Sequence, residues 1–476
     1  MNTILHLGLG SFHRAHQAVY LHRLIEAGDT GWAITAGNLR ADMADTVAAL
    51  IAQDGEYTLE TVSPAGERVY ERIRSITRVI PFEPTLAGLI DVGAQPTTRI
   101  ISFTVTEAGY YLDPNNKLDT SHADLRADLA GTSRSTLYGA VAAILAERRR
   151  RACGPVTLLN CDNLRSNGDR FRAGLLDFLE RRGDAPLRAW VEANTTCPND
   201  MVDRITPRPP ADVAARVLAA TGWADAAPVM AESFIQWVIE DRFIAGRPAW
   251  ENAGAEMVAS VHVFEEAKIR LLNATHSCIA WAGTLRGLHF IHEGVAVPEI
   301  RRMAFDYVTD DVIPSLQSQA PAHAQAPAHT QAPEHPYPID LPAYRDVVLD
   351  RFSNPHLQDT NQRVAMDGFS KIPGFIVPTL RECLARGAPI ASTAVLPALF
   401  FAFLGRWHRG ELGQDYQDGV MDPATAHAFF TARDPLAAFA GDALLWGPLA
   451  GDARLLTALR VASVRVDAFI EGNAHV

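Results

Sequence analysis

The chain has 476 residues, enough for two or three domains, and its hydrophobic content of 48% predicts a substantial core. The formal net charge of −12 argues against a nucleic-acid surface and against binding to acidic membranes. Five scattered cysteines without a CxxC pair favour a reducing cytoplasm and speak against a structural zinc site. Because we also find no membrane-spanning run and no cleavable leader, we expect a cytoplasmic enzyme.

The first predicted elements are a strand, a glycine turn and a helix. Thr3–Leu7 is an apolar strand that runs into the sequence GLGSFHRAH, after which Gln17–Ala27 is helical. The glycines of this turn allow a pyrophosphate to approach the backbone closely. His13 stands where the dinucleotide fingerprint has its third glycine, so an ordinary tight turn remains an equal alternative. The candidate cofactor-binding residues here are Gly8, Gly10, Ser11 and Phe12.

A second strand, Trp32–Ala36, carries the residues that bear on the choice of cofactor. It is followed by Arg40 and Asp42. An acidic residue near this strand end holds the ribose hydroxyls of NAD, whereas an arginine favours NADP. These two residues therefore leave the choice between NAD and NADP open.

The alternation of strands and helices continues through the middle of the chain. Arg68–Ile80 has strand-like alternation, and Arg99–Val105 is a buried strand with Thr106 and Glu107 at its carboxyl end. Ligands bind at such carboxyl ends in open α/β sheets. We therefore add Thr106 and Glu107 to the candidate cofactor site.

Further along, a helix at Ser135–Arg150 precedes a short strand at Val156–Leu159, and Asn167–Arg182 is again helical. The loop Asn160–Asn163 follows the strand at its carboxyl end. Thr196–Pro207 is rich in polar residues and bounded by prolines, which by itself predicts a solvated loop. Together these elements predict an α/β, Rossmann-type dinucleotide-binding domain over residues 1–263.

Strand signals fade after residue 263, and long helical patterns dominate residues 264–476. We therefore predict a second, mainly α-helical domain that carries substrate binding and catalysis. Its first helix is predicted over Glu265–His276, where apolar residues recur at helical intervals.

Four polar side chains share one face of this predicted helix. With Lys268 as zero and roughly 100° per residue, Glu265 lies at about 60° and His276 at about 80°. Asn273 lies at about 140° by the same arithmetic. A lysine among apolar neighbours loses proton affinity and can act as a general base, while an amide and an imidazole can bind an alkoxide oxygen. The alternative is a surface helix with a polar face.

Residues 317–338 differ in kind from the rest of the chain, because they repeat a unit of Ala, Pro, His and Gln. The repeat spaces His323, His329 and His335 evenly, which invites a metal-site interpretation. Proline in every unit prevents a helix that would bring the histidines together, so we predict a flexible surface insertion and no metal. Beyond it, Arg363 and Lys371 are cations that can bind a hydroxylated substrate or simply lie on the surface.

Six separated motifs, in this order, resemble the mannitol dehydrogenase family of polyol-specific long-chain dehydrogenases. They are GLGSFHRAH, TVTEAGYY, NCDN, PNDMVDRITP, KIRLLNATH and RFSNPHLQDTNQRVAMDGFSK, and they span almost the whole chain. The resemblance implies a metal-independent dehydrogenase in which the Lys-x4-Asn-x2-His pattern carries catalysis.

The resemblance also implies a role for each matching residue. Lys268 is the general base, His276 orients the substrate, and Asn273 and Asn163 form the oxyanion site. Glu265 matches a residue implicated in proton exchange with solvent. The positions that match the family's substrate pocket are Asp203, Arg363 and Lys371.

The sequences LETVSPAGE, LLNCDN and NATHSCIAWAGTL are most similar to those of the D-arabinitol 4-dehydrogenases of this family. This implies NAD-dependent oxidation of D-arabinitol to D-xylulose, with a small polyol or ketose as the substrate and neither nucleic acid nor a membrane as a partner. The alternatives are another pair such as D-mannitol and D-fructose, reduction of fructuronate, or a catalytically silent NAD-binding regulator. For the oligomeric state we expect a monomer or a small homo-oligomer.

Overall fold

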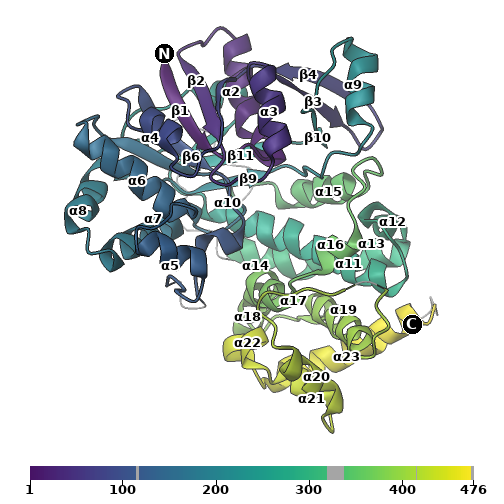
Figure 1. Ribbon diagram of the computed structural model, residues 1–476. Coiled ribbons are helices and arrows are strands. Elements are labelled where there is room, and N and C mark those ends of the chain that lie inside the picture. The colour runs from purple at the N-terminus through teal and green to yellow at the C-terminus, as the bar shows by residue number, and fades with distance from the viewer. Residues whose placement is uncertain (114–116, 319–336, 414, 473–476) are drawn as a thin grey trace, which may run out of the picture. The chain divides into compact units, whose positions relative to one another are not determined.

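The computed structural model describes residues 1–113, 117–318, 337–413 and 415–472 (Figure 1). It divides into two compact units, Met1–His262 and Val263–Val476. None of the described helices combines the length and the apolar character that crossing a membrane requires.

The first unit is built on a six-stranded sheet in which all neighbouring strands are parallel. Its spatial order is β5 (Ile76–Ile80), β2 (Trp32–Gly37), β1 (Asn2–Leu7), β6 (Thr98–Phe103), β7 (Val156–Asn160), β8 (Thr195–Thr196). Counted along the chain, this is the order 3-2-1-4-5-6 of dinucleotide-binding folds. The strand order reverses between β1 and β6, which is where such folds bind their ligand. The predicted Rossmann-type fold is thereby confirmed.

Helices cover both faces of this sheet, which explains why its central strands β1, β2, β6 and β7 are largely buried without alternation (Figure 1). Ile4 and Ile100 pack with α2 (Gln17–Glu26) and α3 (Ala44–Ala52) in one core cluster. Their neighbours Leu5 and Ile101 point to the opposite face. The helices on that face are α4 (Ala87–Gly93), α6 (Leu137–Arg150), α7 (Asn167–Arg181) and α8 (Ala185–Asn194).

Two three-stranded sheets complete the strands of this unit. One has the order β10-β3-β4, with β10 at Val229–Glu232, β3 at Tyr57–Val62 and β4 at Arg68–Ile73. The other has the order β12-β11-β9, with β12 at Glu256–Val258, β11 at Gln236–Glu240 and β9 at Asp200–Asp203. The remaining helices are α1 (Ser11–Ala15), the 3₁₀ turn η1 (Glu107–Tyr110), α5 (Ala123–Leu129), α9 (Val213–Thr221) and the 3₁₀ turn η2 (Trp250–Ala253).

These sheets correct two interpretations of the sequence. The prediction of a solvated loop over Thr196–Pro207 was wrong at its centre, because β9 is buried along its whole length and pairs with β11. The alternation over Arg68–Ile80 belongs to two strands in different sheets, β4 and β5. The pairing partners decide both outcomes, since β9 pairs with β11, β4 with β3 and β5 with β2, and local polarity does not reveal these pairs.

The second unit is helical, as expected. From its start, α10 (His262–Ala267) leads into the π-helical turn η3 (Lys268–Asn273) and then into α11 (Ala274–Leu285). The next elements are α12 (Ile291–Ala296), α13 (Pro298–Asp306), the π-helical turn η4 (Tyr307–Val312), α14 (Ile313–Ser318), α15 (Leu341–Phe352) and α16 (Asn361–Ala365). They are followed by α17 (Gly368–Lys371), the π-helical turn η5 (Ile372–Ile376), α18 (Val377–Ala385) and α19 (Ala391–His408). The last elements are α20 (Pro423–Thr431), α21 (Pro435–Ala440), α22 (Ala443–Trp446), the 3₁₀ turn η6 (Gly447–Leu449) and α23 (Ala453–Ile470).

Most of the predicted insertion, with His323, His329 and His335, lies outside the described residues. Its predicted ends at 317 and 338 need correction. Gln317 belongs to α14, which continues to Ser318. On the other side, Tyr337 is buried and its hydroxyl donates to the carbonyl of Val263 over 2.6 Å.

Candidate active site

A cavity of about 500 Å³ in the first unit lies at the carboxyl ends of β1, β2 and β6. Four of the predicted cofactor-binding residues line it, namely Gly8, Gly10, Asp42 and Thr106. Ser11, Phe12 and Glu107 are not among its lining residues. Phe12 instead lies against His16, with the ring centroids 5.1 Å apart.

The glycine turn leaves space for a ligand at the backbone. Gly8 has φ = +136°, a conformation that L side chains rarely adopt, and its N–H donates to the carbonyl of Gly37 over 2.9 Å. At Gly10 a Cβ would meet no described atom within 4 Å. These residues therefore suit the close approach of a pyrophosphate.

His13 replaces the third glycine of the fingerprint without blocking the turn. Its ring is buried and stacks on His6 of β1 at 3.4 Å between centroids. Nδ1 of His6 lies 2.9 Å from Oγ of Ser102, which donates to Oε1 of Gln17. Burial lowers the pKa of His6 to about 3 and that of His13 well below its usual value. In the usual fingerprint the third glycine lets the helix pack closely against the strand. Here the stacked neutral rings of His6 and His13 form the contact between strand and helix.

Arg40 and Asp42, which left the cofactor choice open, have different surroundings. The guanidinium of Arg40 donates to the hydroxyl of Tyr111 over 2.7 Å and to Asp124 Oδ2 over 3.0 Å. Its Nε also donates to the carbonyl of Ser135 over 3.2 Å. Arg40 and Asp42 are both exposed and both line the cavity. The arginine is thus already engaged by protein groups.

The loop after β7 places Asn163 at the surface and buries the residue before it, Asp162. The carboxylate of Asp162 accepts from the N–H of Val105 over 2.6 Å and from the hydroxyl of Tyr110. Burial raises the pKa of Asp162 to about 7, against the opposing effect of these hydrogen bonds. Through these two hydrogen bonds, Asp162 connects the loop after β7 to the loop after β6. Our interpretation of the sequence passed over it, although it stands inside NCDN.

Asp203, predicted to contact substrate, is the last residue of β9. It is 4% exposed and pairs in register with Gln236 of β11.

In the second unit, the predicted catalytic helix is three consecutive helical segments. Lys268 is the first residue of the π-helical turn η3 and Asn273 is the last. Glu265 precedes the turn in α10, and His276 follows it in α11. Lys268 and Glu265 are buried, at 6% and 4% exposure.

The helical wheel therefore needs correction, because its step of roughly 100° applies to an α-helix only. A π-helix closes i→i+5 hydrogen bonds, so residues five apart lie on the same side of the helix. Lys268 and Asn273 have this spacing. They consequently lie closer in direction than the predicted separation of about 140°.

His276 is oriented by two neighbours. Its ring stacks on Phe352 with centroids 4.4 Å apart, and its Nε2 lies 3.3 Å from Oδ2 of Asp359. Burial lowers the pKa of His276, and Asp359 only partly offsets this effect. The imidazole is therefore neutral near pH 7.

Asp359 also binds Arg363, which was predicted to contact substrate. Arg363 donates to Asp359 Oδ1 from Nε over 2.9 Å and from Nη2 over 2.6 Å. Against the opposing effect of burial, His276 and Arg363 lower the pKa of Asp359 to about 2. The sequence did not lead us to predict Asp359 as a site residue. The available signal was its position four residues before Arg363, the spacing of an ion pair on a helix.

Lys371, the other predicted substrate residue of this unit, ends α17. Its Nζ donates to the carbonyl of Val364 over 2.6 Å. Burial lowers the pKa of Lys371 to about 8. Its ammonium group therefore titrates close to neutral pH.

Two family models cover nearly the whole chain. Residues 2–252 match the mannitol dehydrogenase Rossmann domain, and residues 260–456 match the mannitol dehydrogenase C-terminal domain. The chain belongs to the mannitol dehydrogenase family. It is accordingly a polyol dehydrogenase, as the sequence predicted, with a domain of the type that binds a dinucleotide.

Named relatives in this family align along almost their full length. D-arabinitol 4-dehydrogenase of Ralstonia nicotianae is 63% identical over 469 residues, which are 98% of this chain and 97% of the relative. D-arabinitol 4-dehydrogenase of Klebsiella pneumoniae is 55% identical over 458 residues, 96% of each chain. Among solved structures, Pseudomonas fluorescens mannitol 2-dehydrogenase in ternary complex with NAD and D-mannitol superposes with a TM-score of 0.82. It is 31% identical, and the alignment covers 99% of this chain and 94% of that one.

Proposed function

We propose that this polyol dehydrogenase oxidises D-arabinitol to D-xylulose with NAD, using Lys268 as the general base and no metal. The observation that carries the mechanism is one π-helical turn with buried Lys268 at its start and Asn273 at its end. The substrate assignment is supported by two D-arabinitol 4-dehydrogenases at 63% and 55% identity.

For the cofactor we propose NAD, bound in the cavity after β1, β2 and β6. Asp42 accepts hydrogen bonds from the ribose hydroxyls, and Gly8 and Gly10 admit the pyrophosphate. NADP would need a cation for its 2′-phosphate, and Arg40 already donates to Tyr111 and Asp124. When bound, NAD supplies the hydride acceptor at the nicotinamide C4.

Lys268 begins the chemistry. In its neutral form this buried lysine takes the hydroxyl proton of the substrate while hydride leaves the same carbon and the C=O bond forms. Asn273 and Asn163 donate hydrogen bonds to the oxygen as negative charge develops on it. Glu265, buried one turn before Lys268, passes the proton on to solvent.

His276 orients the substrate through a fixed tautomer. Oδ2 of Asp359 lies 3.3 Å from Nε2, so its charge favours the tautomer with the proton on Nε2, and Nδ1 accepts from a substrate hydroxyl. Arg363, Lys371 and Asp203 bind the remaining hydroxyls. In this proposal Asp359 acts on the substrate through both His276 and Arg363.

The test is NADH formation by the purified protein with D-arabinitol, D-mannitol, xylitol and D-sorbitol, together with fructuronate reduction. We expect the highest kcat/KM with D-arabinitol, and D-xylulose as the product identified by chromatography. A higher kcat/KM with D-mannitol or fructuronate would move the assignment to that substrate. The cytoplasmic location and the monomer or small homo-oligomer remain predictions.

A further inference from the structure

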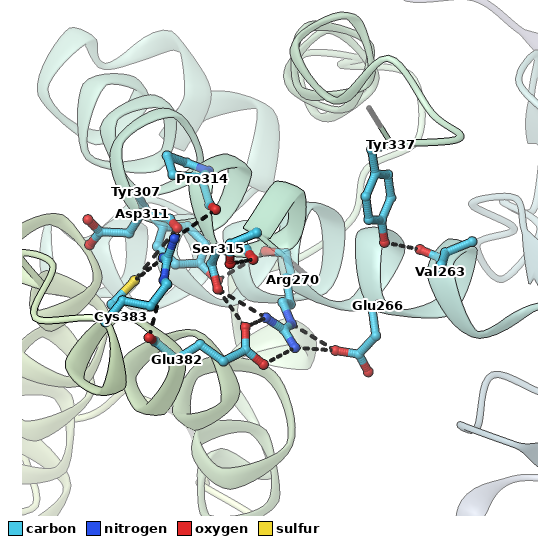
Figure 2. Close-up of polar contacts among 12 residues, drawn as sticks. Val263, Glu266, Arg270, Tyr307, Asp311, Pro314, Ser315, Tyr337, Glu382 and Cys383 are labelled. Carbon is cyan, nitrogen blue, oxygen red and sulfur yellow. Dashed lines mark hydrogen bonds and ion pairs between the residues drawn. The ribbon is translucent and has the colours of Figure 1, made fainter. Parts of the chain in front are cut away.

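The π-helical turn that carries Lys268 and Asn273 is anchored at its third residue, Arg270 (Figure 2). Arg270 is 3% exposed, and its guanidinium reaches between Glu266 on one side and Glu382 on the other. Glu266 belongs to α10 and Glu382 to α18. A single side chain thus connects the turn to elements before and far beyond it.

The contacts of this guanidinium use each of its nitrogen atoms. Nε donates to Glu266 Oε2 over 2.7 Å, Nη2 donates to Glu382 Oε1 over 2.9 Å, and Nη1 donates to Glu382 Oε2. Ser315 of α14 donates to the same Oε2 over 2.5 Å. Although burial acts in the opposite direction, Glu382 and Glu266 raise the pKa of Arg270. The guanidinium therefore stays charged throughout the working pH range.

The backbone of the same residue is held as well. The hydroxyl of Tyr307 donates to the carbonyl of Arg270 over 3.1 Å. Tyr307 is fully buried and begins the second π-helical turn, η4. Both the side chain and the carbonyl of Arg270 thus bind groups outside its own helix.

A contribution to folding stability does not explain why Glu266, Arg270 and Glu382 are buried together. Two carboxylates and a guanidinium pay a desolvation cost when buried, and apolar residues of similar volume usually stabilise a fold as well or better. A π-helical turn is rare, and such turns occur frequently at functional sites. What the cluster does is fix the turn against a second helix, because Arg270 binds Glu266, four residues before it, and Glu382 of α18 at the same time.

We propose that Arg270 is a positioning residue that holds the chain from Lys268 to Asn273 as a π-helical turn. The turn keeps the base and the oxyanion amide, five residues apart, on one side of the helix. An α-helical turn would separate them by about 140°. This inference rests on the proposed roles of Lys268 and Asn273 and adds the residue that sets their spacing.

The test replaces the whole charged cluster, with the triple variant Arg270→Met, Glu266→Leu and Glu382→Leu. Because no buried charge is left unpaired, we expect folding and NADH binding, followed by fluorescence, close to those of the wild type. We expect kcat to fall by about 100-fold, the cost of a misplacement near 1 Å. The pH inflection of kcat should shift as well. Tyr307→Phe removes the hydrogen bond to the carbonyl of Arg270 and should also lower kcat. It provides the test if the triple variant does not fold.

A matched control is Asp311→Asn in η4, whose carboxylate accepts from the N–H and the hydroxyl of Thr393, both over 2.7 Å. It should lower the Tm without changing kcat or its pH profile. Wild-type kcat and pH inflection in a folded triple variant, or in Tyr307→Phe if the triple variant does not fold, would overturn the proposal.

A last comparison separates this inference from the proposed function. In a Lys268→Ala background the cluster substitutions should cause a smaller loss of kcat than in the wild type, because only the amide of Asn273 is left to position. A full additional loss in that background would overturn the positioning role. If Lys268→Ala alone keeps wild-type turnover, it is the proposed function that fails.

Discussion

Nε2 of His276 lies 3.3 Å from Oδ2 of Asp359, and the same carboxylate accepts two hydrogen bonds from Arg363. His276 lies in α11, whereas Asp359 lies in the segment just before α16. That segment is held by the N–H of Ile291, which donates to the carbonyl of Asp359 over 2.9 Å. One buried carboxylate thus joins the proposed orienting histidine to a proposed substrate-binding arginine.

Asp359→Asn should lower kcat/KM for the polyol by about 10- to 100-fold, the usual effect of removing the carboxylate partner of a functional histidine. The reason is that the amide can hold His276 in the wrong tautomer and no longer pairs with Arg363. NAD binding, measured by titration, should not change. Asp346→Asn is the control, because Asp346 is an exposed carboxylate that pairs with Arg345 on α15. Equal kcat/KM in wild type and Asp359→Asn would contradict the role.

Polyol oxidation should rise with pH through one ionisation and then level off, as Lys268 loses its proton. Lys268→Ala should lower kcat by about two to four orders of magnitude and remove this inflection. Lys268→Arg should rescue poorly, because a guanidinium does not deprotonate in the working range. Initial rates across a pH series provide the measurement.

Lys371 is the necessary comparison for this experiment, because burial lowers the pKa of Lys371 to about 8. Lys371→Met should raise KM for the polyol and keep the inflection of kcat. The assignment of the base would be reversed if Lys371→Met removed the inflection and Lys268→Ala kept it.

NAD should be preferred over NADP because Arg40 is held by Tyr111 and Asp124. Asp124→Ala should remove one hydrogen-bond partner of Arg40, so that the guanidinium can bind the 2′-phosphate of NADP. We expect kcat/KM for NADP to rise by about tenfold, the contribution of one charged hydrogen bond. Asp42→Ala should instead lower kcat/KM for NAD. Comparable kcat/KM for the two cofactors in the wild type would reject the preference.

Asp162 should make the stability of the protein depend on pH. Its pKa is raised by burial to about 7 in the folded protein, so the folded state binds its proton more tightly than the unfolded state does. The stability from this protonated carboxyl is fully present below about pH 4 and is lost as the pH rises to about 7, by up to about 1.4 kcal/mol per pH unit.

Urea unfolding between pH 5 and pH 8 provides the measurement. Asp162→Asn should reduce the decrease of the unfolding free energy over this range. Asp177→Asn, which removes a more exposed carboxylate paired with Arg181, is the control. The same decrease in Asp162→Asn as in the wild type would rule out Asp162 as its source.

Exhaustive treatment with a chelator should leave turnover unchanged, because the proposed base is a lysine and the proposed oxyanion donors are amides. Activity before and after dialysis against EDTA provides the measurement. Loss of turnover that added zinc restores would contradict the metal-free mechanism.

The sequence by itself determined the Rossmann-type fold and the family. Strands such as Thr3–Leu7 and Arg99–Val105 carry apolar residues on both faces because both faces of the sheet are covered, and this pattern is local. The glycine turn is local too, since only glycine readily takes the φ of +136° found at Gly8. The motif KIRLLNATH likewise needs no partner to be recognised.

Only the tertiary structure decided how the site residues are held. The π-helical turn at Lys268 departs from the helical periodicity that the sequence suggests, and its residue Arg270 binds Glu382 and Tyr307, which both lie outside the segment. The pairing of His276 with Asp359, and of Arg40 with Tyr111 and Asp124, joins residues far apart in the chain. Local propensity carries no information on such partners, because their contacts form only when separate elements pack together.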